Sequence, residues 1–310
     1  MQRSARNKTI SLSEEEARRY ASLCPRAYAP GTADAILCGD AFALLPSLPE
    51  KCADLLIADP PYNLRKTYGD SAFQKMSEQD YAAFTRRWLE AVRPALKDTA
   101  SIYVCGDWRT SMVIGGILGG YFFIQNRITW QREKGRGAQK NWKNAMEDVW
   151  FATVSPKHYT FNAQAVMTRR RVLAPYRIEN HPRDWTEDAD SGLKYRDTYP
   201  SNFWDDVTVP YWSMPENTDH PAQKPEKLCA RLILASSSPG DVILDPFAGV
   251  GTTAVVAKKL GRSFLCIERE EAYCALAQKR LELAEADPRI QGYTDGVFWE
   301  RNTLAAQKKL

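Results

Sequence analysis

The chain has 310 residues, 44% of them hydrophobic, and a formal net charge of +4 at pH 7. This length fits two small domains or one large α/β domain with an insertion, and the hydrophobic content is sufficient for a full core. Seven scattered cysteines without a C-x-x-C pair argue against a disulfide framework and a zinc site, so we predict no metal ligands. Because no apolar run reaches about 18 residues and the N-terminus has no apolar signal segment, we expect a soluble, cytoplasmic protein that does not bind membranes.

Short apolar runs typical of buried β-strands recur along the chain. They occupy residues 35–40, 53–59, 100–106, 121–130, 147–154, 241–247 and 263–269. Helical patterns lie between several of these runs: residues 77–96 open with a Ser N-cap, residues 225–236 open with Pro, and residues 270–286 repeat apolar residues at helical spacing. The alternation predicts an α/β fold with a doubly wound, mostly parallel sheet.

The region from 131 to 215 breaks this alternation, since it is rich in charged residues, Trp, Tyr, Asn and Pro and lacks long periodic runs. We read it as an insertion. The predicted division is an N-terminal extension (1–33), the first half of the α/β domain (34–130), the insertion (131–215), the second half of the domain (216–286) and a C-terminal tail (287–310).

Positive charge is concentrated in the middle of the chain. Residues 127–183 hold twelve Lys or Arg and four Asp or Glu, a net charge of +8, so the remaining residues carry −4 of the total of +4. A basic segment in an otherwise acidic protein suggests that a polyanion docks there. A solvated basic face is the alternative interpretation.

Two predicted strands end in unusual residues. The first strand ends in Asp245, and the chain then turns through Gly249 and Gly251 into a helix and returns as a strand that ends at Glu268. Glycines let the backbone approach a ligand closely, and the acid after the returning strand can accept hydrogen bonds from a ribose diol. This predicts a nucleoside-cofactor site. The G-x-G-x-x-A pattern also fits NAD, so a nicotinamide oxidoreductase and a purely structural turn stay open.

The second unusual strand end is Asp59-Pro60-Pro61-Tyr62, directly after the run "LLIA". The exocyclic amine of a nucleobase is a poor nucleophile, because its lone pair is delocalised into the ring. It becomes reactive when both N–H groups are held by acceptors, here the Asp59 carboxylate and the Pro60 carbonyl. Tyr62 offers a ring on which an extruded base can stack. A turn that only ends the strand is the alternative.

"DPPY" at 59–62 followed by "DPFAGVGTT" at 245–253 resembles the S-adenosylmethionine-dependent amino DNA methyltransferases, in the motif order of their β group. The resemblance implies a class I methyltransferase-like fold with circularly permuted motifs, and a target-recognition region at 131–215. It implies S-adenosyl-L-methionine as cofactor and double-stranded DNA as partner, and it allows a homodimer and a cognate restriction endonuclease. Many members that modify cytosine N4 carry Ser at the position of Asp59, so adenine N6 is the favoured target and cytosine N4 the alternative.

The resemblance also implies roles for individual residues. Asp40 and Ala41 in "CGDAF" would lie at the cofactor adenine, and Lys224 in "DHPAQKPEKL" at its methionine carboxylate. Trp130 in "NRITWQ" stands where the family places an aromatic near the flipped base, with a core role as the alternative. The further cofactor-binding residues are Asp245, Phe247, Gly249, Gly251, Thr252 and Glu268, and Pro61 completes the catalytic motif. The predicted DNA-binding residues are Asn63, Arg136, Lys140, Lys143, Arg169, Arg170 and Arg171.

Overall fold

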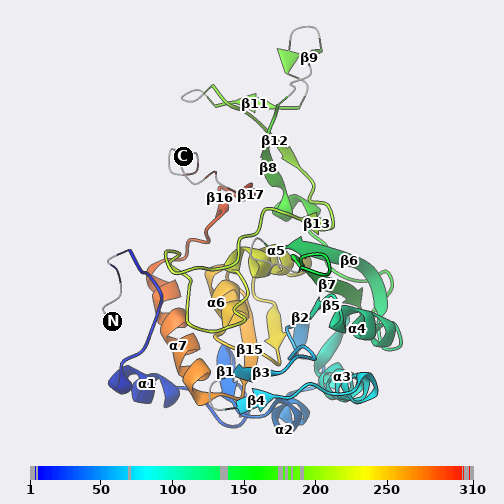
Figure 1. The fold of residues 1–310 in the computed structure, drawn as a ribbon, viewed down its shortest axis with the longest axis vertical. Coiled ribbons are helices and arrows are strands. Elements are labelled where there is room, and N and C mark those ends of the chain that lie inside the picture. Colours follow the sequence, from blue (N-terminus) through cyan, green and yellow to red (C-terminus); the bar gives the residue numbers. More distant parts are fainter. Residues whose placement is uncertain are drawn as a thin grey trace.

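The fold is centred on an eight-stranded sheet with the order β1-β15-β14-β2-β5-β7-β6-β13 (Figure 1). The computed structural model describes residues 4, 6–68, 71–132, 139–173, 177–178, 181–182, 184–188, 192–301, 303 and 307. The strands are β1 (Ala35–Cys38), β2 (Ala53–Ala58), β5 (Leu96–Asp107), β6 (Phe123–Gln131), β7 (Met146–Thr153), β13 (Phe203–Trp204), β14 (Val242–Asp245) and β15 (Ser263–Glu268). Among these described strands only β7 runs antiparallel to its neighbours, which confirms the predicted mostly parallel α/β sheet.

Helices cover both faces of this sheet. One face carries α5 (Glu226–Ser236), α6 (Thr252–Lys259) and α7 (Glu271–Ala286), and the other carries α2 (Ala41–Leu44), α3 (Glu78–Val92) and α4 (Thr110–Leu118). Successive side chains of a strand point to opposite faces, so Leu55 and Ile57 of β2 belong to the first core, and Leu56 belongs to the second. The 3₁₀ turns are Leu45–Ser47, Arg93–Ala95 and Ala163–Val166, and α1 (Glu14–Ala21) packs against α7.

The predicted helices at 77–96, 225–236 and 270–286 are confirmed, and the helix α4 was missed. The Ser77 hydroxyl caps α3 by accepting a hydrogen bond from the amide of Asp80 at 3.1 Å. Gly115 in α4 weakens the helical signal of the sequence. A Cβ atom at Gly115 would lie 2.3 Å from the ring of Trp150, so close packing of α4 on β7 requires the glycine.

A second, smaller sheet projects beyond the main sheet at the top of Figure 1. Its order is β11-β12-β8-β17-β16, formed by β8 (Thr168–Arg171), β11 (Thr186–Glu187), β12 (Lys194–Thr198), β16 (Tyr293–Thr294) and β17 (Val297–Trp299). The first three lie in the predicted insertion and the last two in the predicted C-terminal tail. Phe298 of β17 pairs with Thr168 of β8, so strands from the predicted insertion and from the predicted C-terminal tail share one sheet. The short hairpins are β3 (Lys66–Tyr68) with β4 (Ser71–Phe73), and β9 (Arg177–Ile178) with β10 (His181–Pro182).

A buried cluster of charges lies between the two sheets. The carboxylate of Asp206 accepts two hydrogen bonds from the guanidinium of Arg231, at 2.7 and 3.0 Å, and one from Nζ of Lys227 at 2.8 Å. Burial alone would raise the pKa of Asp206, but the two cations outweigh it and hold the pKa below its usual range. Lys227 also donates to the carbonyl of Trp299 in β17, so the cluster ties the small sheet to α5.

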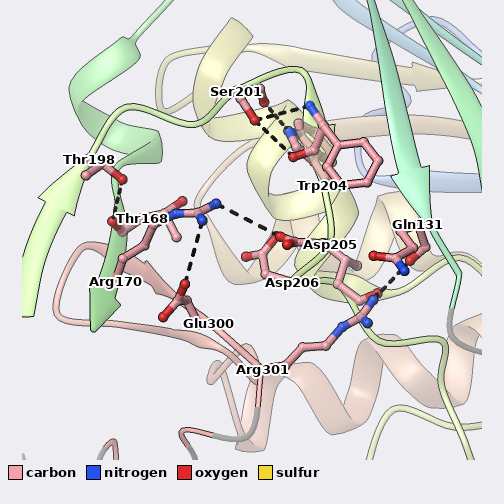
Figure 2. A network of polar contacts seen from close by, with 12 residues as sticks. Gln131, Thr168, Arg170, Thr198, Ser201, Trp204, Asp205, Asp206, Glu300 and Arg301 are labelled. Atoms are coloured by element: carbon pink, nitrogen blue, oxygen red, sulfur yellow. Dashed lines mark hydrogen bonds and ion pairs between the residues drawn. The ribbon is translucent and has the colours of Figure 1, made fainter. Parts of the chain in front are cut away.

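Figure 2 shows polar contacts of residues next to this cluster, with Asp206 as the labelled member of the cluster. Arg170 on β8 lies 3.7 Å from a carboxylate oxygen of Glu300 and 4.0 Å from one of Asp205. Arg301 donates to the carbonyl of Gln131 at 3.0 Å, at the end of β6. These contacts connect the C-terminal segment both to the insertion and to the edge of the main sheet. No helix in the described ranges is long and apolar enough to cross a membrane.

Candidate active site

The carboxyl ends of the central strands border a cavity of about 500 Å³. Ligands of open α/β sheets bind at this edge. Both predicted motifs contribute to the lining, which includes Asp59, Pro60, Pro61 and Tyr62 after β2, Phe247 and Gly249 after β14, Glu268 at the end of β15, and Asp40 and Ala41 after β1. Pro60 and Pro61 have no N–H group to continue the strand ladder, so β2 ends at Ala58 and the tetrapeptide faces the cavity.

Glu268 is held firmly at the wall of this cavity. One carboxylate oxygen accepts the amide of Gly249 at 2.8 Å and the other accepts the amide of Glu270 at 2.7 Å. Burial raises the pKa of Glu268 to about 7. Each carboxylate oxygen keeps a second lone pair, so Glu268 can still accept hydrogen bonds from a ribose diol. The residues present therefore fit the predicted nucleoside cofactor.

Gly249 has φ of +54°, and a Cβ atom there would lie 3.3 Å from the ring of His220. Gly251 has φ of +71°, and a Cβ atom there would lie 2.7 Å from that of Ala277 in α7. Both positions need glycine, since side chains rarely adopt this conformation. Gly249 lines the cavity, whereas Gly251 is required for the packing of the loop on α7.

Asp245 and Thr252 stabilise the loop between β14 and α6 through hydrogen bonds. Asp245 is buried and accepts the hydroxyl of Thr253 at 2.6 Å and the amide of Phe247 at 2.9 Å. Burial raises the pKa of Asp245 to about 7. The hydroxyl of Thr252 accepts a hydrogen bond from Arg280 at 3.0 Å. Neither residue is among the described residues that line the 500 Å³ cavity, so both are placed to shape the loop.

Asp40 occupies the start of α2. Its carboxylate accepts the amide of Phe42 at 2.7 Å, which fixes the side chain as the cap of the helix. Asp40 and Ala41 both line the cavity. They follow β1, the edge strand, which β15 and β14 separate from β2 and the residues 59–62.

Asp59 and Tyr62 belong to a network of four polar side chains. Oδ1 of Asp59 accepts the hydroxyl of Tyr62 at 3.0 Å, and Oδ2 lies 2.5 Å from Nζ of Lys224. Glu147, at the start of β7, lies at the same distance of 3.0 Å from the Tyr62 hydroxyl, as the alternative acceptor for its one proton, and 3.5 Å from Nζ of Lys224. Burial alone would lower the pKa of Lys224, but Asp59 and Glu147 raise it above its usual range. Lys224 is therefore a charged partner of the Asp59 carboxylate.

Glu147 and His220 are site residues that the sequence analysis missed. A single acid near the start of a predicted strand gives no local signal, and Glu147 reaches Tyr62 only because β7 pairs with β5 beside β2. His220 lines the cavity, and burial together with the charges of Lys66 and Lys224 lowers its pKa to about 3. The imidazole is therefore neutral at physiological pH.

A second cavity of about 260 Å³ shares Tyr62, Lys66 and His220 with the first. Its lining includes Arg132, Asn144, Glu147 and Lys224, and an edge of Trp130. Trp130 is 2% exposed, and its indole N–H donates to the carbonyl of Val207 at 2.9 Å. This is the environment of a core residue, the alternative that the sequence left open for Trp130.

The predicted DNA-binding residues lie outside both cavities, among the residues that the structure describes. Lys140 and Lys143 are exposed, on either side of Trp142, which is 92% exposed. Arg169 forms two hydrogen bonds of 2.8 Å with Asp197 on the neighbouring strand. Arg170 lies near Glu300 and Asp205, Arg171 is exposed, and Arg136 lies outside the described residues.

Asn63 holds the base of the β3–β4 hairpin. Its carboxamide donates to the carbonyl of Met76 at 3.0 Å and accepts the amide of Met76 at 2.7 Å. The sequence predicted a mobile closing loop at 63–77. The structure has two short strands there, and Phe73 and Gln74 of this segment line the large cavity. Motion of the segment stays a prediction.

Comparison with known proteins links this architecture to DNA modification. A family model described as DNA methylase, for N6 and N4 methyltransferases, matches residues 53–279. The chain is 34% identical over 258 residues to the DNA adenine methyltransferase YhdJ of Escherichia coli (strain K12), covering 81% of this chain and 84% of that protein. It is also 34% identical over 251 residues to the type II methyltransferase M.HpaI of Haemophilus parainfluenzae, covering 80% and 74%.

Solved structures share the fold at lower sequence identity. The cytosine-N4-specific PvuII DNA methyltransferase is 20% identical with a TM-score of 0.58, over 79% of this chain and 85% of that one. The M1.HpyAVI complex with SAM is 22% identical with a TM-score of 0.54, over 79% and 98%. A putative DNA modification methylase of Thermus thermophilus, crystallised with S-adenosyl-L-methionine, is 21% identical with a TM-score of 0.54, over 86% and 97%.

Proposed function

Because this chain belongs to the N6/N4 family of DNA methylases, we propose that it transfers a methyl group from S-adenosyl-L-methionine to the N6 amine of an adenine flipped out of double-stranded DNA. Family membership makes the protein a DNA methyltransferase and leaves the nicotinamide oxidoreductase without support. The adenine assignment draws on Asp59 in the first position of the motif and on the 34% identity to an adenine methyltransferase.

The observation that carries the proposal is the position of Asp59. Its carboxylate stands at the carboxyl end of β2, on the same cavity as Glu268, which is suited to a ribose diol. Asp59, a hydrogen-bond acceptor for the target amine, and Glu268, an acceptor for the cofactor ribose, therefore line the same cavity of about 500 Å³. That volume is within the range of small-molecule sites in proteins.

The chain's own residues would position the reactants. S-adenosyl-L-methionine supplies an activated methyl group on its sulfonium when bound. Asp59 and the Pro60 carbonyl accept the two amine hydrogens, so the nitrogen lone pair becomes available, and Tyr62 supports the base by stacking. Most of the rate enhancement comes from alignment, and the proton released from the amine after transfer passes to solvent. Asp40, Ala41, Phe247, Gly249 and Glu268 are the residues we propose to hold the cofactor.

Incubation of the protein with methyl-labelled S-adenosyl-L-methionine and DNA tests the function. We expect label in the DNA, recovered as N6-methyladenine after digestion to nucleosides. Recovery as N4-methylcytosine would overturn the adenine assignment and keep the family activity. Absence of label from DNA of diverse sequence would overturn the proposed reaction. Sequencing of modified DNA would give the recognition site.

Cofactor affinity is expected to depend on pH through Glu268, whose pKa is about 7. Ribose hydroxyls bind the charged carboxylate better, and such hydrogen bonds lower its pKa, so binding releases a proton. Affinity should therefore rise about tenfold from pH 6 to pH 8, mostly below pH 7. Calorimetric titration with S-adenosyl-L-methionine measures this, and Glu268→Gln should bind more weakly with no such slope. A wild-type affinity that is flat across this range would remove Glu268 from the cofactor site.

DNA binding is expected to weaken steeply with salt, because exposed Lys side chains near the site release counterions from the phosphates. Lys140→Ala and Lys143→Ala should each reduce the slope of log K against log salt by about 1. Lys51→Ala is the control. Lys51 precedes β2, so it lies at the amino end of that strand, away from the cavity, and it forms an ion pair with Asp98. Fluorescence anisotropy of labelled duplex DNA measures the slopes. Equal slopes for all three variants would exclude these lysines as phosphate contacts.

The remaining partners are proposed from the resemblance. A homodimer would be recognised by sedimentation, and a cognate restriction endonuclease by cleavage of unmodified DNA at the same site. The seven cysteines are free thiols, which suits the reducing cytoplasm that we propose as the location.

A further inference from the structure

The catalytic carboxylate is engaged on both oxygens. Oδ1 of Asp59 accepts the Tyr62 hydroxyl at 3.0 Å, and Oδ2 accepts Nζ of Lys224 at 2.5 Å. Each oxygen of Asp59 keeps a second lone pair, so a target amine can still donate to it, but the carboxylate is a weaker acceptor while it also binds these two donors. Lys224 is the stronger competitor, since it is charged and its side chain is 11% exposed. Asp59 therefore becomes a stronger acceptor for the amine when another acceptor takes the hydrogen bonds of Tyr62 and Lys224.

Glu147 is placed to be that acceptor. Its Oε2 lies 3.0 Å from the Tyr62 hydroxyl and 3.5 Å from Nζ of Lys224. The Tyr62 hydroxyl has one proton, so it can donate to Asp59 or to Glu147 but not to both at once. A small rotation of either donor moves its hydrogen bond from one carboxylate to the other without breaking the network.

The other oxygen of Glu147 is anchored. Oε1 accepts NH1 of Arg132 at 2.5 Å, and the Glu147 side chain is 7% exposed. Glu147 pairs with Asp107 of β5 and Trp130 of β6, so its backbone is fixed in the interior of the sheet. Arg132 thus orients the carboxylate, and only Oε2 is left to exchange partners.

We propose that Glu147 is a positioning residue for methyl transfer, which takes the hydrogen bonds of Tyr62 and Lys224 when the target amine engages Asp59. This inference rests on the proposed function. It involves exchange of hydrogen bonds alone: the hydroxyl proton stays on Tyr62, and Lys224 stays protonated. Burial and the charges of Asp59 and Glu147 raise the pKa of Tyr62 well above its usual value, which keeps that proton in place.

Glu147→Gln is the main test. With the Gln carbonyl bound to Arg132, its NH₂ group faces Tyr62 and Lys224 and cannot accept from them. Both donors then stay on Asp59. We expect the single-turnover rate of methyl transfer to fall about 10- to 100-fold, as for loss of a charge-assisted hydrogen bond, while the dissociation constants for DNA and S-adenosyl-L-methionine change by less than about threefold. Glu147→Asp, which keeps the charge at a greater distance, should lose less.

Asp148→Asn is the matched control. Asp148 is the next residue on β7, is equally buried, and points to the other face, where it accepts the hydroxyls of Ser111 at 2.6 Å and Thr129 at 3.0 Å. Loss of this buried carboxylate should lower the melting temperature and leave the transfer rate of the folded protein near that of the wild type. The comparison separates a positioning role of Glu147 from general damage to β7.

A double-mutant cycle with Tyr62→Phe gives the decisive readout. Phe keeps the stacking ring and removes the hydroxyl that Glu147 would accept, so Glu147→Gln should cost less in this background, by at least about threefold. Fully additive losses, or a wild-type rate for Glu147→Gln, would overturn the proposal. So would a loss that appears entirely in DNA or cofactor affinity. Failure of the wild type to methylate DNA would instead overturn the proposed function, so the two failures are distinguishable.

Discussion

Asp59→Ala is expected to lower the rate of methyl transfer by about 10³-fold, because it removes one of the two acceptors that release the amine lone pair. Cofactor binding should stay largely intact, since Glu268 is held by the amides of Gly249 and Glu270 and makes no contact with Asp59 among the described hydrogen bonds. Lys224 keeps Glu147 as a partner at 3.5 Å, so the substitution leaves no isolated buried cation. The fold should therefore survive.

Single-turnover transfer of labelled methyl groups, together with calorimetric binding of S-adenosyl-L-methionine, measures this effect. Asp54→Asn is a suitable control, because Asp54 lies at the other end of β2 and binds Lys97 at 2.7 Å and the amide of Val242 at 3.0 Å. It should alter stability and leave the rate unchanged. Retention of activity in Asp59→Ala would remove Asp59 from the mechanism.

Asp206→Asn is expected to reduce the free energy of unfolding by about 3–5 kcal/mol, the range for removing one charged partner of a buried ion pair. The substitution leaves two buried cations, Arg231 and Lys227, without the carboxylate that both contact. Burial already lowers the pKa of Lys227 to about 8 in the presence of Asp206. Loss of the carboxylate should lower that pKa further, and Lys227 would then lose its proton at neutral pH.

Urea unfolding followed by fluorescence measures the change. Asp197→Asn is the control: its partner Arg169 and Asp197 itself are partly exposed, so the pair should contribute at most about 1 kcal/mol. A cost below that value for Asp206→Asn would contradict the interpretation of the cluster as the anchor of the small sheet. The small sheet should loosen first, because Lys227 also binds the carbonyl of Trp299.

The main sheet and the two strand ends could be predicted from the sequence because their signals are local. A continuous apolar run such as 55–58 needs cover on both faces, and Pro60 and Pro61 must end the strand. Parallel strands place their carboxyl ends at one edge, so residues 59–62 meet Pro246, Phe247 and Gly249 around one cavity although they lie far apart in the chain. The helix α4 was missed because Gly115, needed for contact with Trp150, weakens its local signal.

The sequence by itself therefore determined the fold class, the edge of the sheet at which the cavity lies, and several of the side chains that line it, among them Asp59 and Glu268. Only the tertiary structure decided that Lys224 contacts Asp59, that Glu147 reaches Tyr62, and that β17 joins β8 in the small sheet. Such contacts join residues separated by about 85 to 165 positions and depend on strand order and on side-chain direction, neither of which leaves a periodic or motif signal in the chain. Asp59 can thus be found in the sequence from its motif, whereas its contact with Lys224 and the position of Glu147 beside Tyr62 are set by packing.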